Sequence, residues 1–387
     1  MPEFDRIASG NNMEMPARSP LVPDVAFVCA SRRFDGIFFA SRQMIQALRS
    51  QGVTASWYQC VDPSFEGGYF TQEQVIRGFR VPIRSIEEGF NRLWAFPRRV
   101  RKVPERILVA TDPTLANLPL GGRKGVVIVH DLRPLTPYGD RVDTRAMFLY
   151  ALRRLKRFDR ILTFTDYLKL QLEETGFDPE RIGVVPLPSR FPTLPTSRVR
   201  ELVARRHRGD RLNVTYVTTD RSYKNLDLFI RLAREFGRPG SPDRANFTLV
   251  SRLRPATRRA VAAAGLENLR VTEAVEDMAT VYLETDVLLH PSLHEGFGAP
   301  LVEAMAFGIP VVTSRLRPMS DLVGDAGLLA NPLIDDEWAH CLRELTDPHQ
   351  FEMFSQRSMD RSRLFSLARF QDGVAAEFGP LLGRAPR

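Results

Sequence analysis

The chain has 387 residues, enough for two or three domains, with the hydrophobic (43%) and charged (26%) content of an ordinary globular protein and a formal net charge of +8. No apolar run approaches the length of a membrane span, and the polar first twenty residues lack the apolar core of a secretion signal. The three cysteines are too few and too widely spaced for a disulfide framework or a metal cluster, so we expect a reducing, cytoplasmic environment.

The first half of the chain alternates predicted strands and helices. Residues 1–22 lack hydrophobic periodicity, and we expect them to be a disordered lead-in. The apolar run 25–29 predicts the first strand, and a polar loop ending at Gly36 leads into a helix at 37–48. Further strands are predicted at 53–58, 107–112, 125–132, 160–165 and 181–188, and helices at 72–79, 85–95, 143–157 and 167–175.

A histidine–aspartate pair, His130 and Asp131, lies at the end of the predicted strand 125–132. Ligands of open parallel sheets bind at the carboxyl ends of the strands, so this pair is well placed to meet one. The alternative is a packed histidine beside an aspartate that caps the next turn.

A linker is indicated by Pro188, Pro192 and Pro195 and by the basic run from Arg198 to Arg211. The alternation then resumes, with strands predicted at 212–217, 246–251, 269–271, 287–290, 309–312 and 327–329 and helices at 226–236, 256–264, 277–284, 300–307, 335–346, 348–358 and 361–383. Because both halves alternate strands and helices, the sequence predicts an α/β chain with two doubly wound parallel sheets.

The stretch 290–312 carries the most specific pattern. Two carboxylates, Glu295 and Glu303, flank the glycine loop 296–298, and Pro300 stands where a helix begins. A helix start offers unpaired amides to an anion, and glycines let a phosphate approach the backbone. The carboxylates would repel a phosphate but can accept hydrogen bonds from a ribose or sugar hydroxyl. The pattern therefore favours a nucleotide-diphosphate sugar; the alternative is a glycine turn with one surface glutamate and one that packs on the helix.

The run from Glu295 to Val312, with seven residues between its two glutamates, resembles the signature of retaining glycosyltransferases of family 4, which have the GT-B fold. The resemblance spans nearly the whole chain and is strongest at 212–332. It implies two Rossmann-like domains facing a central cleft, an acceptor-side domain at 23–195 and a nucleotide-sugar-binding domain at 208–362. A C-terminal helix at 363–387 is expected to cross back to the first domain.

The same resemblance assigns roles in the donor site. Glu303 would bind the ribose hydroxyls, Glu295 would lie beside the donor sugar, and the amides of Gly296, Phe297 and Gly298 would face the diphosphate. The other donor-binding residues that it implies are Gly36, Thr219, Arg221, Lys224, Ala274 and Val275.

Two positions in the expected donor site depart from the family pattern. The family usually has two adjacent glycines in the first loop, where this chain has Gly36 alone. It often has an arginine five residues before the lysine that contacts the diphosphate. Here Thr219 stands at that position before Lys224, and Arg221 is the candidate for the missing charge.

The implied reaction is a retaining, metal-independent glycosyl transfer with His130, Glu295 and Lys224 as the catalytic residues. His130 would lie against the donor sugar and Asp131 towards the acceptor. Lys224 and the helix start would stabilise the departing diphosphate in place of a divalent metal, so we expect no metal and no cofactor beyond the donor. Glu295 as a nucleophile fits this poorly, because it is also expected to orient sugar hydroxyls.

The acceptor is expected to be a glycan or a lipid-linked molecule. Aromatic and apolar residues at positions 90, 93, 94 and 96 adjoin a basic cluster at 98–102, which suits a peripheral contact with an anionic membrane or, alternatively, a solvated helix with some core aromatics. A second class of function is a catalytically silent GT-B partner subunit that binds a nucleotide sugar or stabilises another transferase. We expect no nucleic-acid partner, because the basic residues form no recognisable binding module.

Overall fold

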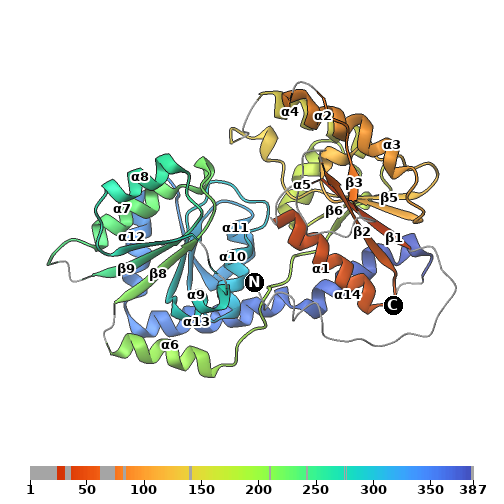
Figure 1. Cartoon of the computed structure of the whole chain (residues 1–387). Coiled ribbons are helices and arrows are strands. Elements are labelled where there is room, and N and C mark those ends of the chain that lie inside the picture. Colours follow the sequence, from red (N-terminus) through yellow and green to blue (C-terminus); the bar gives the residue numbers. More distant parts are fainter. Residues whose placement is uncertain are drawn as a thin grey trace.

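The computed structural model describes residues 24–30, 36–61, 75–81, 84–138, 142–208, 211–240, 243–273, 275 and 277–384, and it shows two lobes, each a parallel sheet covered by helices (Figure 1). The expected disordered lead-in at 1–22 and the candidate residue Ala274 lie outside the described residues. Within these residues, no helix has both the length and the apolar composition needed to cross a bilayer.

The first lobe contains a seven-stranded parallel sheet in the order β3-β2-β1-β4-β5-β6-β7. Its strands are β1 (Val25–Cys29), β2 (Ala55–Val61), β3 (Val75–Arg77), β4 (Ile107–Ala110), β5 (Lys124–Ile128), β6 (Arg160–Thr163) and β7 (Ile182–Val184). Its helices are α1 (Gly36–Ser50), α2 (Arg84–Phe90), α3 (Phe96–Val100), α4 (Val142–Leu155) and α5 (Asp166–Glu174). The strand order reverses beside β1, which pairs with both β2 and β4 and so defines the switch point where such sheets bind ligands.

The second lobe repeats this arrangement with six strands in the order β10-β9-β8-β11-β12-β13. These are β8 (Leu212–Val217), β9 (Ala245–Val250), β10 (Leu269–Thr272), β11 (Val287–His290), β12 (Val311–Ser314) and β13 (Gly327–Ala330). The helices are α6 (Ser197–His207), α7 (Leu226–Phe236), α8 (Pro255–Ala263), α9 (Met278–Glu284), α10 (Ala299–Ala306), α11 (Met319–Val323), α12 (Asp335–Glu344) and α13 (Pro348–Ser362). Its switch point lies between β8 and β11.

Two of the predicted segments were wrong. The helix predicted at 72–79 is contradicted by β3, a three-residue edge strand in which Ile76 is buried and pairs with Cys60 of β2. The basic run expected to be linker forms α6, because Val199, Leu202 and Val203 recur at helical spacing and pack into the core of the second lobe. Residues 75–77 form a strand because they pair with β2, and α6 is a helix because its apolar face is buried.

The last helix, α14 (Leu367–Phe378), returns to the first lobe and packs along α1, as expected (Figure 1). The Phe378 ring stacks on that of Phe27 in β1, with 6.4 Å between centroids. Glu377 forms an ion pair with Arg160 of β6, in which Nη2 donates to Oε1 over 3.0 Å. Helix α14 therefore completes the packing of the first sheet.

We expect Phe378→Ala to lower the free energy of unfolding by about 3–5 kcal/mol, because it leaves a cavity against β1 in a fully buried position. The matched control is Leu367→Ala in the same helix, where the side chain is 54% exposed and the change is expected to stay within about 0.5 kcal/mol. Urea titration of both variants measures the difference. Equal effects would contradict the anchoring of the first lobe by Phe378.

Candidate active site

The candidate site lies at the switch point of the second sheet. The loop 218–225 leaves the carboxyl end of β8, and the loop 291–298 leaves the carboxyl end of the neighbouring strand β11. Because the two strands are adjacent and parallel, the loops start side by side at one edge of the sheet. They bring together two of the predicted catalytic residues, Lys224 and Glu295.

Glu295, whose side chain is 11% exposed, is the centre of a largely buried polar network. Its Oε1 accepts a hydrogen bond from Lys224 Nζ at 2.5 Å and another from His290 Nε2 at 2.7 Å. Burial opposes ionisation of the carboxyl group, but the charge of Lys224 and the hydrogen bond from His290 outweigh it and hold the pKa of Glu295 well below its ordinary value. Glu295 is therefore an anion at neutral pH, and Lys224 is held by it.

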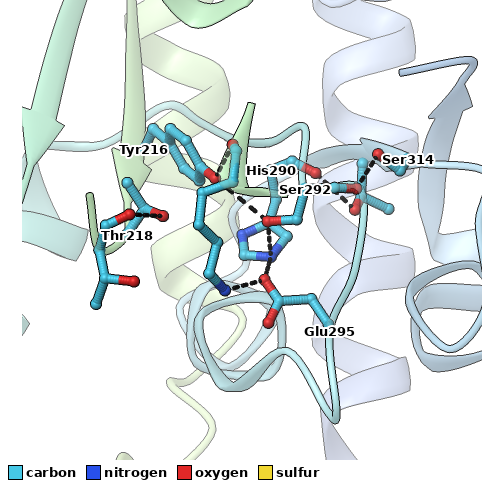
Figure 2. A network of polar contacts seen from close by, with 9 residues as sticks. Tyr216, Thr218, His290, Ser292, Glu295 and Ser314 are labelled. Atoms are coloured by element: carbon cyan, nitrogen blue, oxygen red, sulfur yellow. Dashed lines mark hydrogen bonds and ion pairs between the residues drawn. The ribbon is translucent and has the colours of Figure 1, made fainter. Parts of the chain in front are cut away.

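A second set of hydrogen bonds fixes the backbone around this pair. The Tyr216 hydroxyl donates to the carbonyl of Lys224 at 2.6 Å and lies 3.2 Å from Ser292 Oγ, as Figure 2 shows for the labelled tyrosine and serine. Ser314 Oγ donates to the carbonyl of Ser292 at 2.6 Å. Burial raises the pKa of Tyr216, so its hydroxyl stays protonated and available as a donor. These bonds join the loops after β8 and β11 to the strands β8 and β12.

The other candidates on the loop after β8 lie towards solvent. Thr219 and Arg221 are exposed, and Asp220 between them is held by Arg254 at 2.9 Å, a hydrogen bond that lowers the pKa of Asp220 to about 2. Asn225 turns the chain into α7 with a left-handed φ of 52°. Of the positively charged candidates on this loop, the structure places Lys224 in the Glu295 network and leaves Arg221 at the surface.

The glycine loop leads directly into α10. Gly298 has a φ of 108°, in the left-handed region that favours glycine, and Pro300 follows in the first turn of the helix. Phe297 is buried beneath the loop, against Phe365. This local geometry gives the loop a helix amino end, which is an anion-binding feature.

The same loop touches the first lobe at the predicted histidine–aspartate pair. A Cβ built on Gly296 would lie 2.0 Å from the carbonyl oxygen of His130 and 3.1 Å from Cβ of Asp131. His130 Nε2 donates to the carbonyl of Thr111 at 2.8 Å, and Asp131 Oδ1 accepts from the amide of Arg133 at 3.0 Å. The structure thus brings His130 and Asp131 against the glycine loop.

A cluster of rings between the lobes was not predicted. His294, next to Glu295, has its ring centroid 6.3 Å from that of Tyr138 in the first lobe and 6.2 Å from that of Tyr223 in the second. The Arg133 guanidinium lies 5.3 Å from the Tyr223 ring. Burial lowers the pKa of His294. Its position in the signature loop was the available signal, but the sequence says nothing of its partners.

Glu303, the expected ribose ligand, is 2% exposed and already engaged by protein groups. The Tyr282 hydroxyl donates to Oε2 at 2.8 Å, and the guanidinium of Arg190 donates to both carboxylate oxygens, with Nη2 2.9 Å from Oε2. Sequence reasoning missed both partners. Arg190 lies in the proline-rich segment between the lobes, and nothing in its neighbours points to α10.

Two further candidates lie apart from this network. Gly36 opens α1 beside the switch point of the first sheet, with open space around a Cβ built there. Val275 follows β10 at the far edge of the second sheet. In the described part of the chain, the hydrogen-bond network around Glu295 includes Lys224 and His290 but neither Gly36 nor Val275.

Comparisons with known proteins show similarity to glycosyl transferases. Residues 211–347 match the family model of the group 1 glycosyl transferases. Over 92 residues the chain is 39% identical to the O-antigen chain mannosyltransferase B of Escherichia coli, a match that spans 24% of this chain and 24% of that protein. Over 266 residues it is 24% identical to the O-antigen chain mannosyltransferase RfbU of Salmonella typhimurium, 65% of this chain and 68% of that protein.

Solved structures share the fold over almost the whole chain. Sucrose-phosphate synthase from Thermosynechococcus elongatus superimposes with a TM-score of 0.74 and 18% identity, covering 93% of this chain and 99% of that one. HepE of Anabaena in complex with UDP-glucose superimposes with a TM-score of 0.71 and 16% identity, covering 92% of this chain and 99% of that one.

These likenesses confirm the predicted GT-B fold of two Rossmann-like domains. The family model matches a segment of the second lobe, which is similar there to the group 1 glycosyl transferases. The narrower assignment to family 4 stays a prediction.

We expect Gly296→Ala to lower the rate of the glycosyl transfer predicted from the sequence by at least about tenfold, because the new methyl group would meet the His130 carbonyl and shift the loop against the first lobe. The matched control is Gly89→Ala in α2, where a Cβ has no atom within 4 Å. Steady-state rates and thermal melting of both variants separate a local shift from unfolding. Wild-type turnover in Gly296→Ala would contradict the close contact.

Proposed function

We propose that the chain is a retaining, metal-independent glycosyltransferase that moves a sugar from a nucleotide-diphosphate sugar to a glycan or lipid-linked acceptor. The observation that carries this proposal is the ionised Glu295 paired with Lys224 beside the amino end of α10. A fixed anion suits sugar hydroxyls, and a nearby cation with a helix start suits the diphosphate.

Lys224 and the amino end of α10 stabilise the leaving group. Negative charge develops on the diphosphate as the glycosidic bond breaks, so positive groups fixed nearby lower the barrier. Glu295 and the Tyr216 bond to its carbonyl hold Lys224 in place before the donor arrives. These groups supply the positive potential for which a divalent ion would otherwise be needed, and this supports metal independence.

Retention follows if the acceptor attacks from the face that the diphosphate leaves. The bond from the anomeric carbon to the phosphate oxygen breaks, the bond to the acceptor oxygen forms, and the acceptor proton passes to the phosphate. Glu295, tied to Lys224 and His290, orients hydroxyls of the sugar and stabilises positive charge at the anomeric carbon. Its engagement by two partners argues against a nucleophilic role.

The relatives support the substrate classes. HepE was solved with the nucleotide sugar UDP-glucose, and two curated relatives are named O-antigen chain mannosyltransferases. We therefore propose a nucleotide-sugar donor and an acceptor from glycan biosynthesis. The alternative of a catalytically silent partner subunit is favoured by one observation, the occupation of Glu303 by Arg190. Slow hydrolysis of a nucleotide sugar by the purified chain would show that it is an enzyme and not a silent partner subunit.

We expect Lys224→Ala and His130→Ala to lower turnover by about 10²–10³-fold, because one removes charge stabilisation of the leaving group and the other a contact to the donor sugar. Glu303→Ala should mainly weaken nucleotide binding. The control is Arg200→Ala, an exposed arginine on α6. Nucleotide release from GDP-mannose and UDP-glucose measures the rates. Wild-type rates in all three site variants would contradict the assignment.

An exposed apolar cluster of Phe79, Leu93 and Trp94, each 40–44% exposed, lies on the first lobe beside arginines. The Arg98 guanidinium lies 3.8 Å from the Trp94 ring centroid, and that of Arg99 lies 4.7 Å from the Phe79 ring centroid. Phe96, which the sequence grouped with them, is buried in the core. We propose that this surface contacts an anionic membrane peripherally, on its cytoplasmic side, with the arginines meeting lipid phosphates.

The wild-type chain is expected to float with vesicles that contain phosphatidylglycerol and to stay behind with neutral vesicles. The double variant Leu93→Ser/Trp94→Ser should lose flotation, because it removes apolar area without changing charge. The matched control is Leu333→Ser, a 79% exposed leucine on the second lobe. If the wild-type chain stays in the soluble fraction, the proposed membrane contact is contradicted.

A further inference from the structure

Arg190 links the two lobes through one side chain. Its segment is fixed to the second lobe, because the Ser189 amide donates to the Phe365 carbonyl at 3.0 Å and the Leu194 amide donates to the Ala306 carbonyl at 2.8 Å. The guanidinium pairs with Glu303 of α10 and also lies 5.8 Å from the ring of Phe39 in α1. One cation thus contacts a helix of each lobe.

The geometry of the pair is that of a fork on a carboxylate. Arg190 Nε donates to Oε1 of Glu303, and Nη2 donates to Oε2 at 2.9 Å. A ribose diol offers the same chemistry, two adjacent O–H donors for the two oxygens of one carboxylate. A carboxylate has about four acceptor positions. Arg190 takes two and the Tyr282 hydroxyl a third, so too few remain for a diol while Arg190 is present.

The two partners differ in their freedom to move. The Glu303 side chain is 3% exposed, and Tyr282 holds it from the buried side. The Arg190 side chain is 39% exposed and reaches solvent by rotating about its own bonds. Leaving Glu303 without Arg190 strands a buried carboxylate unless another donor pair replaces the fork. Ribose hydroxyls are such a pair.

We propose that Arg190 is an internal occupant of the ribose position and that nucleotide binding exchanges its guanidinium for the ribose diol on Glu303. This inference rests on the proposed function, since it takes Glu303 as the ribose ligand. The exchange releases the arginine that contacts α1, so occupancy of the nucleotide site changes a contact between the lobes. The nucleotide binds with lower affinity than it would to a site without Arg190, because it must displace that side chain from Glu303.

The test is isothermal titration of wild type, Arg190→Met and Arg190→Lys with GDP and UDP, and with the 2′,3′-dideoxy form of each. Methionine keeps an apolar stem near Phe39 but has no donor, and lysine keeps the charge but loses the fork. We expect Arg190→Met to bind the preferred nucleotide at least tenfold more tightly than wild type and to leave the dideoxy affinity unchanged. Arg190→Lys should show a smaller gain. Arg200→Met on α6 is the control.

Each outcome of this titration either supports or contradicts the inference. Unchanged or weaker binding of the ribonucleotide by Arg190→Met overturns the inference while nucleotide binding by wild type leaves the proposed function standing. An equal gain for the dideoxy form also overturns it, because the gain would then not depend on the diol. If neither wild type nor a variant binds GDP or UDP, the proposed donor site and the inference both fail. Should Arg190→Met melt below the assay temperature, the lysine variant carries the same comparison.

Discussion

The largely buried carboxylate of Glu295 fixes the two loops of the candidate site to one another. A buried ion pair costs desolvation, and it persists only where its remaining hydrogen-bonding positions are satisfied. Here Lys224 and His290 share one carboxylate oxygen, and the hydroxyl of Tyr216 fixes the backbone that carries the lysine. The loops of two adjacent strands are thereby tied at one edge of the second sheet. The next residue, Gly296, lies against the first lobe, so the same constraint sets where the lobes meet.

The overall fold was predictable because its central strands are continuous apolar runs and its helices have clear apolar periodicity. The run Val25–Cys29 is wholly buried, as such a run requires between two layers of helices. Prediction failed where a segment's state depends on a partner far along the chain. Val75–Arg77 is a strand because β2 offers it an edge, and a three-residue stretch carries too little periodicity to show this. In α6, the abundance of arginine concealed three regularly spaced apolar residues.

The candidate site was predictable to the extent that it is local in sequence. Glu295, the glycine loop and the start of α10 form one stretch, and Lys224 stands in a comparable loop after another strand. The partners of Glu303 were beyond prediction, because Tyr282 lies 21 positions from it and Arg190 lies 113. Such contacts depend on how the lobes and the segment between them pack in space. The spacing of residues along the chain does not predict that packing.

The return of α14 to the first lobe has a consequence for biosynthesis. On the ribosome the first sheet emerges early, yet the helix that covers Phe27 and α1 is translated only after the second lobe. The nascent first lobe must therefore wait with apolar surface uncovered while the whole second lobe is made. Domains of most chains fold in order of emergence. Here folding of the first lobe stays incomplete until α14 has been made, so a truncation before Leu367 would damage the lobe that was synthesised first.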